Sequence, residues 1–222
     1  MVYGLNIRPT QGYYVEYEVL DGDMERVRLL DETPDQGGKP QAIGGGRAID
    51  PTHVPRRVRW KDRKKQLMAD FNGGPMISLS ARAKGLIEQY EPGVHQFFSV
   101  TFYDIDGDFL EDRWFLNVCN RLDTIDREHV QGFVMKRYPS RVEAWIPIQD
   151  VVRRKKFDLL PPGYDTTQPS RLVFNRAQIG GAHLWVDRHL SGGIWVSDEL
   201  DAAFDAAGLT GRKAERRWQE TV

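Results

Sequence analysis

The sequence predicts an α+β fold with a mainly antiparallel sheet, a few short helices and two pseudo-repeated strand–helix–strand units. Three observations predict it. Many short stretches alternate apolar and polar residues or are rich in aromatic and β-branched residues, which is typical of strands. Turn-forming Gly, Pro and Asp residues separate several of these stretches. Two segments of about ten residues instead repeat apolar residues at helical spacing.

The first 70 residues are predicted to be rich in strands. Residues 13–20 alternate in the period-two pattern of a strand. A turn at residues 21–23 and a short apolar run at residues 26–30 predict a hairpin or meander. Residues 31–55 are dominated by Pro, Gly, Asp and Gln, which predicts a long loop. We therefore divide the chain into a β-rich N-terminal region over residues 1–70 and an α+β domain over residues 71–222.

Two hairpins are predicted in the second part. Strands at residues 96–103 and 114–118 flank a polar turn, and residues 131–138 and 143–148 form a second pair. Residues 158–170 contain several prolines and are expected to connect elements.

The strand–helix–strand unit occurs twice. Residues 75–80 lead into a helix over residues 81–90, and residues 193–197 lead into a helix over residues 198–207. A Ser stands immediately before each helix, where its hydroxyl can accept a hydrogen bond from an early backbone N–H. Each helix is followed by a turn and a strand-like run. The helices are expected to pack on the sheet through their apolar faces, which include Leu86, Ile87, Leu200 and Phe204.

Composition excludes several classes of protein. The 222 residues are 40% hydrophobic and 28% charged, as in an ordinary soluble globular protein, and the net charge of −1 provides no global field for nucleic acid or anionic lipid. No stretch is apolar enough to span a membrane, and the N terminus lacks the pattern of a secretory signal, so we expect a cytoplasmic protein. The single cysteine, Cys119, excludes an internal disulfide and a Cys-based zinc site, and is expected to be a small buried apolar residue.

Residue patterns that would indicate catalysis are weak. His183 and His189 are the closest histidines, but their spacing, with Asp187 between them, is not that of metal ligands on one helix or strand face. The run of Gly residues at 44–46 lacks the Lys and Ser or Thr of a phosphate-binding loop. We therefore predict no catalytic residues, no metal site, no cofactor and no enzymatic activity. An enzyme with a site around His183, Asp187 and His189 is a competing hypothesis.

Local charge predicts binding surfaces. The acidic run from residue 104 begins like a calcium-binding loop, but Phe109 and Phe115 occupy the positions where Gly and Glu are needed, so a polar hairpin turn is favoured. Residues 56–65 and 153–156 are strongly basic. Six Trp, eight Tyr and ten Phe residues supply aromatic side chains of the kind that anchor protein interfaces. The candidate binding residues are Asp104, Asp106, Asp108, Glu111, Asp112, Arg56, Arg57, Arg59 and Trp60.

Four runs of residues, in their order, carry a resemblance to a known family. They are residues 72–80 (NGGPMISLS), 114–126 (WFLNVCNRLDTID), 172–176 (LVFNR) and 194–211, which begin IWVSDEL and end AGLTG. Over residues of about 70–222 the chain resembles immunity protein family eleven of bacterial polymorphic-toxin systems.

The resemblance implies a protein that binds a secreted toxin and protects the producing cell and its kin. The expected partner is a cognate toxin protein, encoded by the adjacent gene, and no membrane or nucleic-acid partner is expected. If the toxin surface is basic, the acidic hairpin is the first candidate interface; if it is acidic, residues 56–65 are.

Two functions besides the enzyme hypothesis compete with the inhibitor hypothesis. One is a nucleic-acid-binding or regulatory module that uses the basic residues 56–65 and 153–156. The second is a structural or secretion-linked adaptor.

Overall fold

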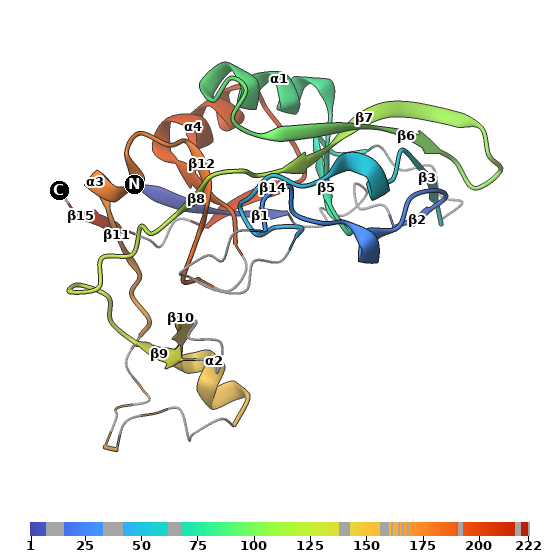
Figure 1. Cartoon of the computed structure of the whole chain (residues 1–222). Helices are drawn as coiled ribbons and strands as arrows, with labels where there is room; N and C mark the ends of the chain where they lie inside the picture. The colour runs from blue at the N-terminus through green and yellow to red at the C-terminus, as the bar shows by residue number, and fades with distance from the viewer. Residues whose placement is uncertain are drawn as a thin grey trace.

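The computed structural model describes residues 1–7, 16–32, 42–61, 68–137, 143–155, 160, 162–163, 165, 167, 169–190, 193–215 and 219–221. It confirms an α+β fold built mostly from strands (Figure 1). The helices are α1 (Ala81–Tyr90), α2 (Ile148–Arg153), α3 (Arg176–Ile179) and α4 (Asp198–Ala206), with short 3-10 turns at Met24–Arg26 and Pro51–His53. The strands are β1 (Val2–Ile7), β2 (Tyr17–Val19), β3 (Arg57–Trp60), β4 (Phe71–Asn72), β5 (Ile77–Leu79), β6 (Gln96–Tyr103), β7 (Phe109–Asn117), β8 (Arg121–Leu122), β9 (Phe133–Arg137), β10 (Glu143–Pro147), β11 (Val173–Asn175), β12 (Leu184–Asp187), β13 (Trp195–Ser197), β14 (Arg212–Glu215) and β15 (Gln219–Thr221).

Two mixed, mainly antiparallel sheets form the body of the molecule. One has the strand order β14-β1-β13-β12-β8, and the other has the order β2-β3-β6-β7-β5-β4. Parallel pairing is limited, among the described strands, to β3 with β6, β8 with β12 and β11 with β15. Both large sheets combine strands from before and after residue 70, since β1 lies between β13 and β14 and β3 lies beside β6.

The N-terminal segments pair differently from the predicted hairpin. β2 falls within the predicted strand at residues 13–20, of which residues 13–15 lie outside the described part, but its partner is β3. β2 does not form the predicted pair with residues 26–30: among the described residues, this segment has a single bridge, between Leu29 and Ile49. Its apolar side chains, with those of the following loop, cover the face of the sheet that carries Val100 and Phe102. Burial of Val27, Ile49 and Val54 therefore takes the place of strand pairing.

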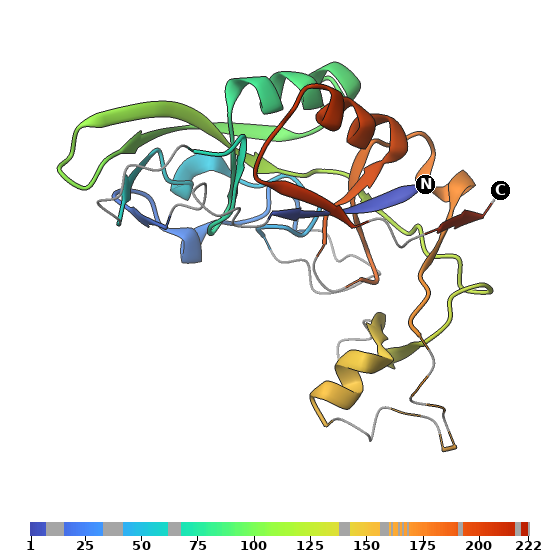
Figure 2. The same ribbon diagram turned by 180° about the vertical axis from the view of Figure 1, so that it is seen from behind.

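The two pseudo-repeated units share one topology. In β5–α1–β6 and in β13–α4–β14 the two strands are parallel and are separated by one antiparallel strand, β7 in the first unit and β1 in the second. The predicted caps are confirmed: Ser80 Oγ and Ser197 Oγ each accept a hydrogen bond of 3.2 Å, from the N–H of Ala83 and of Leu200. The helices α1 and α4 lie side by side over the sheets (Figure 2).

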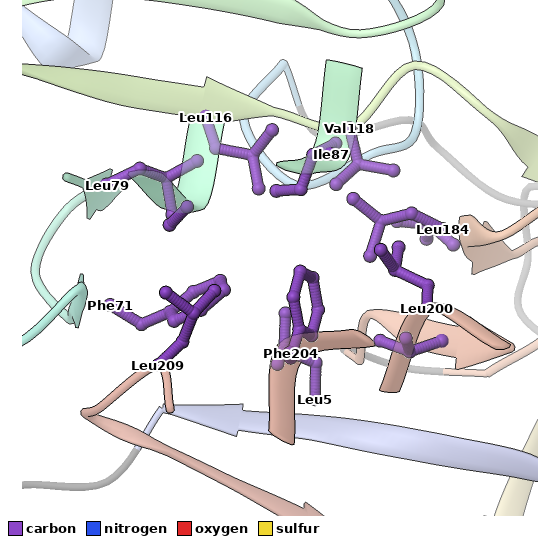
Figure 3. Close-up of a cluster of buried hydrophobic side chains, with 13 residues drawn as sticks. Leu5, Phe71, Leu79, Ile87, Leu116, Val118, Leu184, Leu200, Phe204 and Leu209 are labelled. Carbon is purple, nitrogen blue, oxygen red and sulfur yellow. The ribbon is translucent and has the colours of Figure 1, made fainter. Parts of the chain in front are cut away.

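One apolar core lies between these helices and the two sheets (Figure 3). Ile87, Leu200 and Phe204 are fully buried in it, as predicted, and Leu86 packs against its edge. The ring of Phe204 meets that of Phe71 edge to face, at 5.2 Å between centroids. The core therefore joins the two units into one body.

Asp70, just before β4, ties the two units together at one point. Its carboxylate accepts hydrogen bonds from Ser80 Oγ (2.6 Å), from Arg82 Nη2 (3.1 Å) and from both the N–H and the hydroxyl of Thr210 (2.9 and 3.0 Å). Ser80 caps α1, whereas Thr210 lies in the turn after α4. Burial raises the pKa of Asp70, but these hydrogen bonds outweigh it and hold the pKa below its usual value. We call this group of four residues the Asp70 clasp.

A small lobe is formed by β9, β10 and α2. The predicted hairpin is confirmed, with β9 and β10 antiparallel, and Val134, Ile148 and Val151 form a separate small core. The lobe projects from the body in both views (Figures 1 and 2). Much of the predicted connector at residues 158–170 lies outside the described residues.

Truncation of Phe204 tests the central core. Phe204→Ala should lower the free energy of unfolding by about 3–5 kcal/mol, because it leaves a large cavity between the two units. The matched control is Phe109→Ala, which removes the same side chain from a site that is 61% exposed and should cost about 0.5 kcal/mol or less. Urea unfolding of both variants would measure the difference, and equal losses would contradict the described core.

Asp70→Asn tests the clasp. The substitution should lower the free energy of unfolding at pH 7 by about 1.5–3 kcal/mol, as expected for lost hydrogen bonds to a charged group. Since the folded-state pKa is depressed, the stabilisation by the carboxylate is present above the unfolded pKa of about 3.9 and is lost as the pH falls through the folded pKa. The variant should therefore depend less on pH below about 4. Asp106→Asn, at an exposed site, is the control. If urea unfolding gave wild type, Asp70→Asn and Asp106→Asn the same loss of stability below about pH 4, the proposed role of Asp70 would be contradicted.

Candidate functional site

The hairpin β6–β7 carries the acidic candidates. Its register pairs Gln96 with Asn117 and Thr101 with Asp112, and residues 104–108 form the predicted polar turn. The second strand begins at Phe109, five residues earlier than predicted. α1 packs over the base of the hairpin, where Phe97 and Leu116 reach the central core, and the hairpin extends beyond the helix (Figure 1).

The basic candidates lie beside this hairpin. β3 runs parallel to β6, with Arg57 in register with Thr101 and Arg59 with Tyr103. Since alternate residues of a strand point to opposite faces, these two arginines share a face with Thr101 and Asp112. We define the outer face as the part of this sheet face beyond α1, formed by Arg57, Arg59, Thr101, Tyr103 and Asp112, together with the tip of the hairpin at residues 104–109. The structure thus brings Asp112 and the acidic residues of the tip together with Arg57 and Arg59 on one surface, whereas Glu111 and Trp60 lie on the opposite face of the sheet.

Three of the five acidic candidates stabilise the hairpin itself. Asp104 Oδ1 accepts hydrogen bonds from the backbone N–H of Asp106 (3.0 Å) and of Asp108 (2.8 Å), which fixes the turn. Asp112 Oδ1 accepts a hydrogen bond of 2.7 Å from Thr101 Oγ1 across the ladder. Glu111 forms an ion pair of 3.2 Å with the guanidinium of Arg113.

Glu111 balances the charge of a buried arginine, Arg113. The guanidinium is 1% exposed and donates hydrogen bonds to the carbonyl oxygens of Ala69 (2.5 Å) and Asp70 (3.2 Å). Burial lowers the pKa of Arg113, and Glu111 opposes this shift. A buried charge is costly unless it is paired and hydrogen-bonded, so Glu111 compensates Arg113.

The other two acidic candidates have no such role. Asp106 and Asp108 are exposed, and within the described part of the chain their carboxylates make no hydrogen bond or ion pair. Phe109 follows them directly and is 61% exposed. The tip therefore presents two uncompensated carboxylates and one exposed aromatic ring.

The arginines of β3 are already paired with acids. The Nε of Arg57 lies 3.1 Å from a carboxylate oxygen of Asp21, and Arg59 forms an ion pair with Glu18 on β2. Burial alone would raise the pKa of Asp21. Hydrogen bonds from N–H groups of Arg56 and Arg57 together have the larger, opposite effect, so the pKa lies below its usual value. This pairing reduces the positive charge that phosphate groups would meet.

The remaining basic candidates are divided between sites. Arg56 is exposed beside β3, whereas Trp60 is 6% exposed and packs in the core on the other face of the sheet. Residues 62–65 and Lys156 lie outside the described residues. Residues 153–155 stand at the end of α2 on the small lobe, where Arg153 pairs with Asp150 at 2.9 Å. The described residues of the two basic stretches therefore lie on different parts of the molecule, one at β3 and the other at the end of α2 (Figures 1 and 2).

The residues of the enzyme hypothesis do not form one site. His183 precedes β12, and Asp187 ends it. His183 Nδ1 lies 2.8 Å from the hydroxyl of Ser197, the cap of α4. Asp187 accepts hydrogen bonds from the N–H and hydroxyl of Thr124 and from the N–H of His189, and burial raises its pKa. Among the described residues, no group of three or more His, Cys, Asp or Glu side chains is arranged to hold a metal ion.

A buried polar network was not predicted. Glu91, just after α1, accepts hydrogen bonds from Asn120 Nδ2 (2.9 Å) and from the N–H of His183 (3.0 Å), and its other oxygen lies 2.6 Å from His95 Nε2. His95 Nδ1 accepts a hydrogen bond from the N–H of Cys119, so its proton is on Nε2 and is donated to Glu91. The spacing of Glu91 and His95, four residues apart, could have suggested their contact. Their other partners, Cys119, Asn120 and His183, are distant in sequence and could not have been predicted.

Cys119 differs from its prediction. Its side chain is only partly buried, and its Sγ lies 3.4 Å from the carbonyl oxygen of Asn117, in a polar environment. Burial raises the pKa of the thiol, which disfavours the reactive thiolate.

A cleft of about 340 Å³ opens beside the start of α4. Ile179 and Trp185 form apolar parts of its wall, and Arg176, His183, Ser197 and Glu199 add polar groups. Ser197 is committed to the cap of α4, and His183 to its contact with Ser197. These two side chains therefore have a structural role beside the cleft.

The division of the acidic residues predicts different effects on stability. Asp104→Ala should lower the free energy of unfolding by about 1 kcal/mol, because the two N–H groups of the turn lose their acceptor. Asp106→Ala, two residues away, should change it by about 0.5 kcal/mol or less. Urea unfolding of the two variants tests this, and a larger loss for Asp106→Ala would contradict the assignment.

Comparison with known proteins identifies the family. The model of an immunity protein family, Imm11, matches residues 17–216, so the match begins well before residue 70, where the resemblance in the sequence begins. No curated protein matches the chain. None of the helices in the described part of the chain is long and apolar enough to cross a membrane. The match spans most of the chain, including every strand of the sheet β2-β3-β6-β7-β5-β4 and the outer face, so the chain belongs to the Imm11 family of immunity proteins.

Proposed function

We propose that this chain is a stoichiometric inhibitor that binds one cognate secreted bacterial toxin and thereby protects the producing cell and its kin. Membership of an immunity protein family carries the proposal. The partner would be the product of the adjacent gene, met in the cytoplasm. Inhibition would result from a stable complex, with no reaction catalysed by this chain.

The roles of the polar side chains support a binding function. The buried acids described above, Asp70, Glu91 and Asp187, hold separate segments of the fold together through hydrogen bonds. The outer face, by contrast, combines arginines, aromatic rings and exposed carboxylates. Arg, Tyr, Trp and Phe are enriched in protein interfaces, where a few buried side chains supply most of the binding energy.

Paired charges on the outer face also favour a protein partner over a phosphate backbone. Arg57 and Arg59 each face an acid, and Asp112 lies on the same face. Nucleic-acid binding depends on basic side chains that can neutralise phosphates. An interface between two proteins accommodates both signs of charge when the partner is complementary.

Co-expression tests the proposal. The product of the adjacent gene should arrest growth when expressed alone, and this chain should restore growth. Purified together, the two proteins should form a one-to-one complex, measured by light scattering against the 25.5 kDa of this chain.

The control is Phe204→Ala, which should weaken protection because the fold is destabilised rather than because the interface changes. Failure of the wild-type chain both to bind and to restore growth would contradict the proposal. Salt-sensitive binding of DNA or RNA by the free chain, without any toxin complex, would favour a nucleic-acid-binding function instead.

A further inference from the structure

We infer that the toxin is held by the outer face, with the hairpin tip inserted into a concave, basic surface of the toxin, where Phe109 fills an apolar pocket and Asp106 and Asp108 meet Lys or Arg side chains. This inference rests on the proposed function and names the surface and the chemistry of the partner. It also divides the acidic residues into those that bind and those that hold the hairpin.

Charge at the tip supports a basic partner. Residues 96–117 contain five carboxylates and a single base, Arg113. Arg113 is buried and already balanced by Glu111, so it does not compensate the charge at the tip. Asp106 and Asp108 therefore face solvent without a basic partner among the described residues. Charges of this kind accelerate association with a surface of opposite sign, over the roughly 8–10 Å that salt allows.

The two outer-face arginines of the neighbouring strand do not cancel this field, although the exposed Lys61, directly after β3, adds one positive charge beside it. Arg57 and Arg59 are the outer-face residues of β3, and both are neutralised by acids from the same part of the sheet. A partner that approaches the tip thus meets two unpaired carboxylates there and paired arginines farther along the face. This arrangement favours a partner whose positive side chains concentrate around the position of the tip.

Phe109 provides an anchor between these charges. It is 61% exposed and opposes Tyr103 in the ladder, so two aromatic residues stand where the hairpin narrows to its turn. A single exposed ring is ordinary on a protein surface. Here the ring lies at the projecting end of a hairpin and beside two free carboxylates, which matches the apolar centre and charged rim of an interface.

The hairpin β6–β7 is held in one conformation before any partner binds. Eight register pairs join β6 to β7, and Asp104 fixes the turn through two backbone N–H groups. At the base, the buried guanidinium of Arg113 is bonded to the carbonyl oxygens of Ala69 and Asp70, so the hairpin is connected to the Asp70 clasp. Little conformational freedom would be lost on binding, which favours affinity.

The test measures association of this chain with an inactivated form of the adjacent-gene toxin, by surface-based kinetics at several salt concentrations. Asp106→Asn with Asp108→Asn should reduce the association rate about 3–10-fold at low salt and flatten its dependence on salt. Phe109→Ala should instead increase the dissociation rate, about 30-fold if the ring is an interface anchor.

Matched controls separate these effects from general changes. Glu128→Gln with Glu199→Gln removes two exposed carboxylates elsewhere and should leave the association rate within about twofold. Leu30→Ala removes another exposed apolar side chain, 60% exposed, and should leave the dissociation rate unchanged. If wild type binds but the tip variants behave like these controls, the inference is wrong while the proposed function stands. If wild type does not bind, the proposed function fails first.

Discussion

The relative placement of the two strand–helix–strand units depends on the buried carboxylate of Asp70. A carboxylate removed from water is costly unless donors surround it, and its donors here come from both halves of the fold: Ser80 and Arg82 at the start of α1, and Thr210 after α4. Loss of any of these hydrogen bonds would leave a buried polar group without a partner. The two strand–helix–strand units are therefore stable only in the arrangement that forms all of them. The apolar core supplies most of the attraction between the units, but attraction of this kind is non-directional. The clasp supplies the direction.

The same constraint reaches the outer face through Arg113. Its side chain extends from β7 to the carbonyl oxygens of Ala69 and Asp70, while Glu111 on the same strand balances its charge. Glu111 and Arg113 therefore hold the hairpin against the Asp70 clasp. Two of the other carboxylates, those of Asp106 and Asp108, lie at the tip and face solvent. The turn there is fixed by the hydrogen bonds that Asp104 accepts from their backbone N–H groups. The acidity of this stretch thus has two physical roles, and only the second is available to a partner.

Local features of the fold could be predicted from the sequence, whereas distant pairings could not. The hairpins β6–β7 and β9–β10 and both Ser-capped helices depend on neighbouring residues, and the structure confirms them. The insertion of β1 between β13 and β14, and the parallel pairing of β3 with β6, depend on residues far apart, for which a single sequence has no signal. The site shows the same division. The charged runs were visible, but the acids that pair with Arg57 and Arg59, and the burial of Trp60, follow from the placement of β2 and β3.

The residues that carry the family resemblance are largely those that hold the fold. In the closing run AGLTG, Gly208 ends α4 with φ of 63°, Leu209 is buried in the core and Thr210 bonds Asp70. Gly211 has φ of 82°, and a Cβ there would lie 2.0 Å from the carbonyl oxygen of Phe71, so only Gly fits. Each of these roles restricts the residue type strongly. At the exposed positions 106, 108 and 109 of the tip, by contrast, a substitution is expected to change the free energy of unfolding by only about 0.5 kcal/mol. A chain with this clasp can therefore exchange the side chains at these three positions at little cost to folding. Under the proposed function, such exchanges would change the toxin surface that the tip fits.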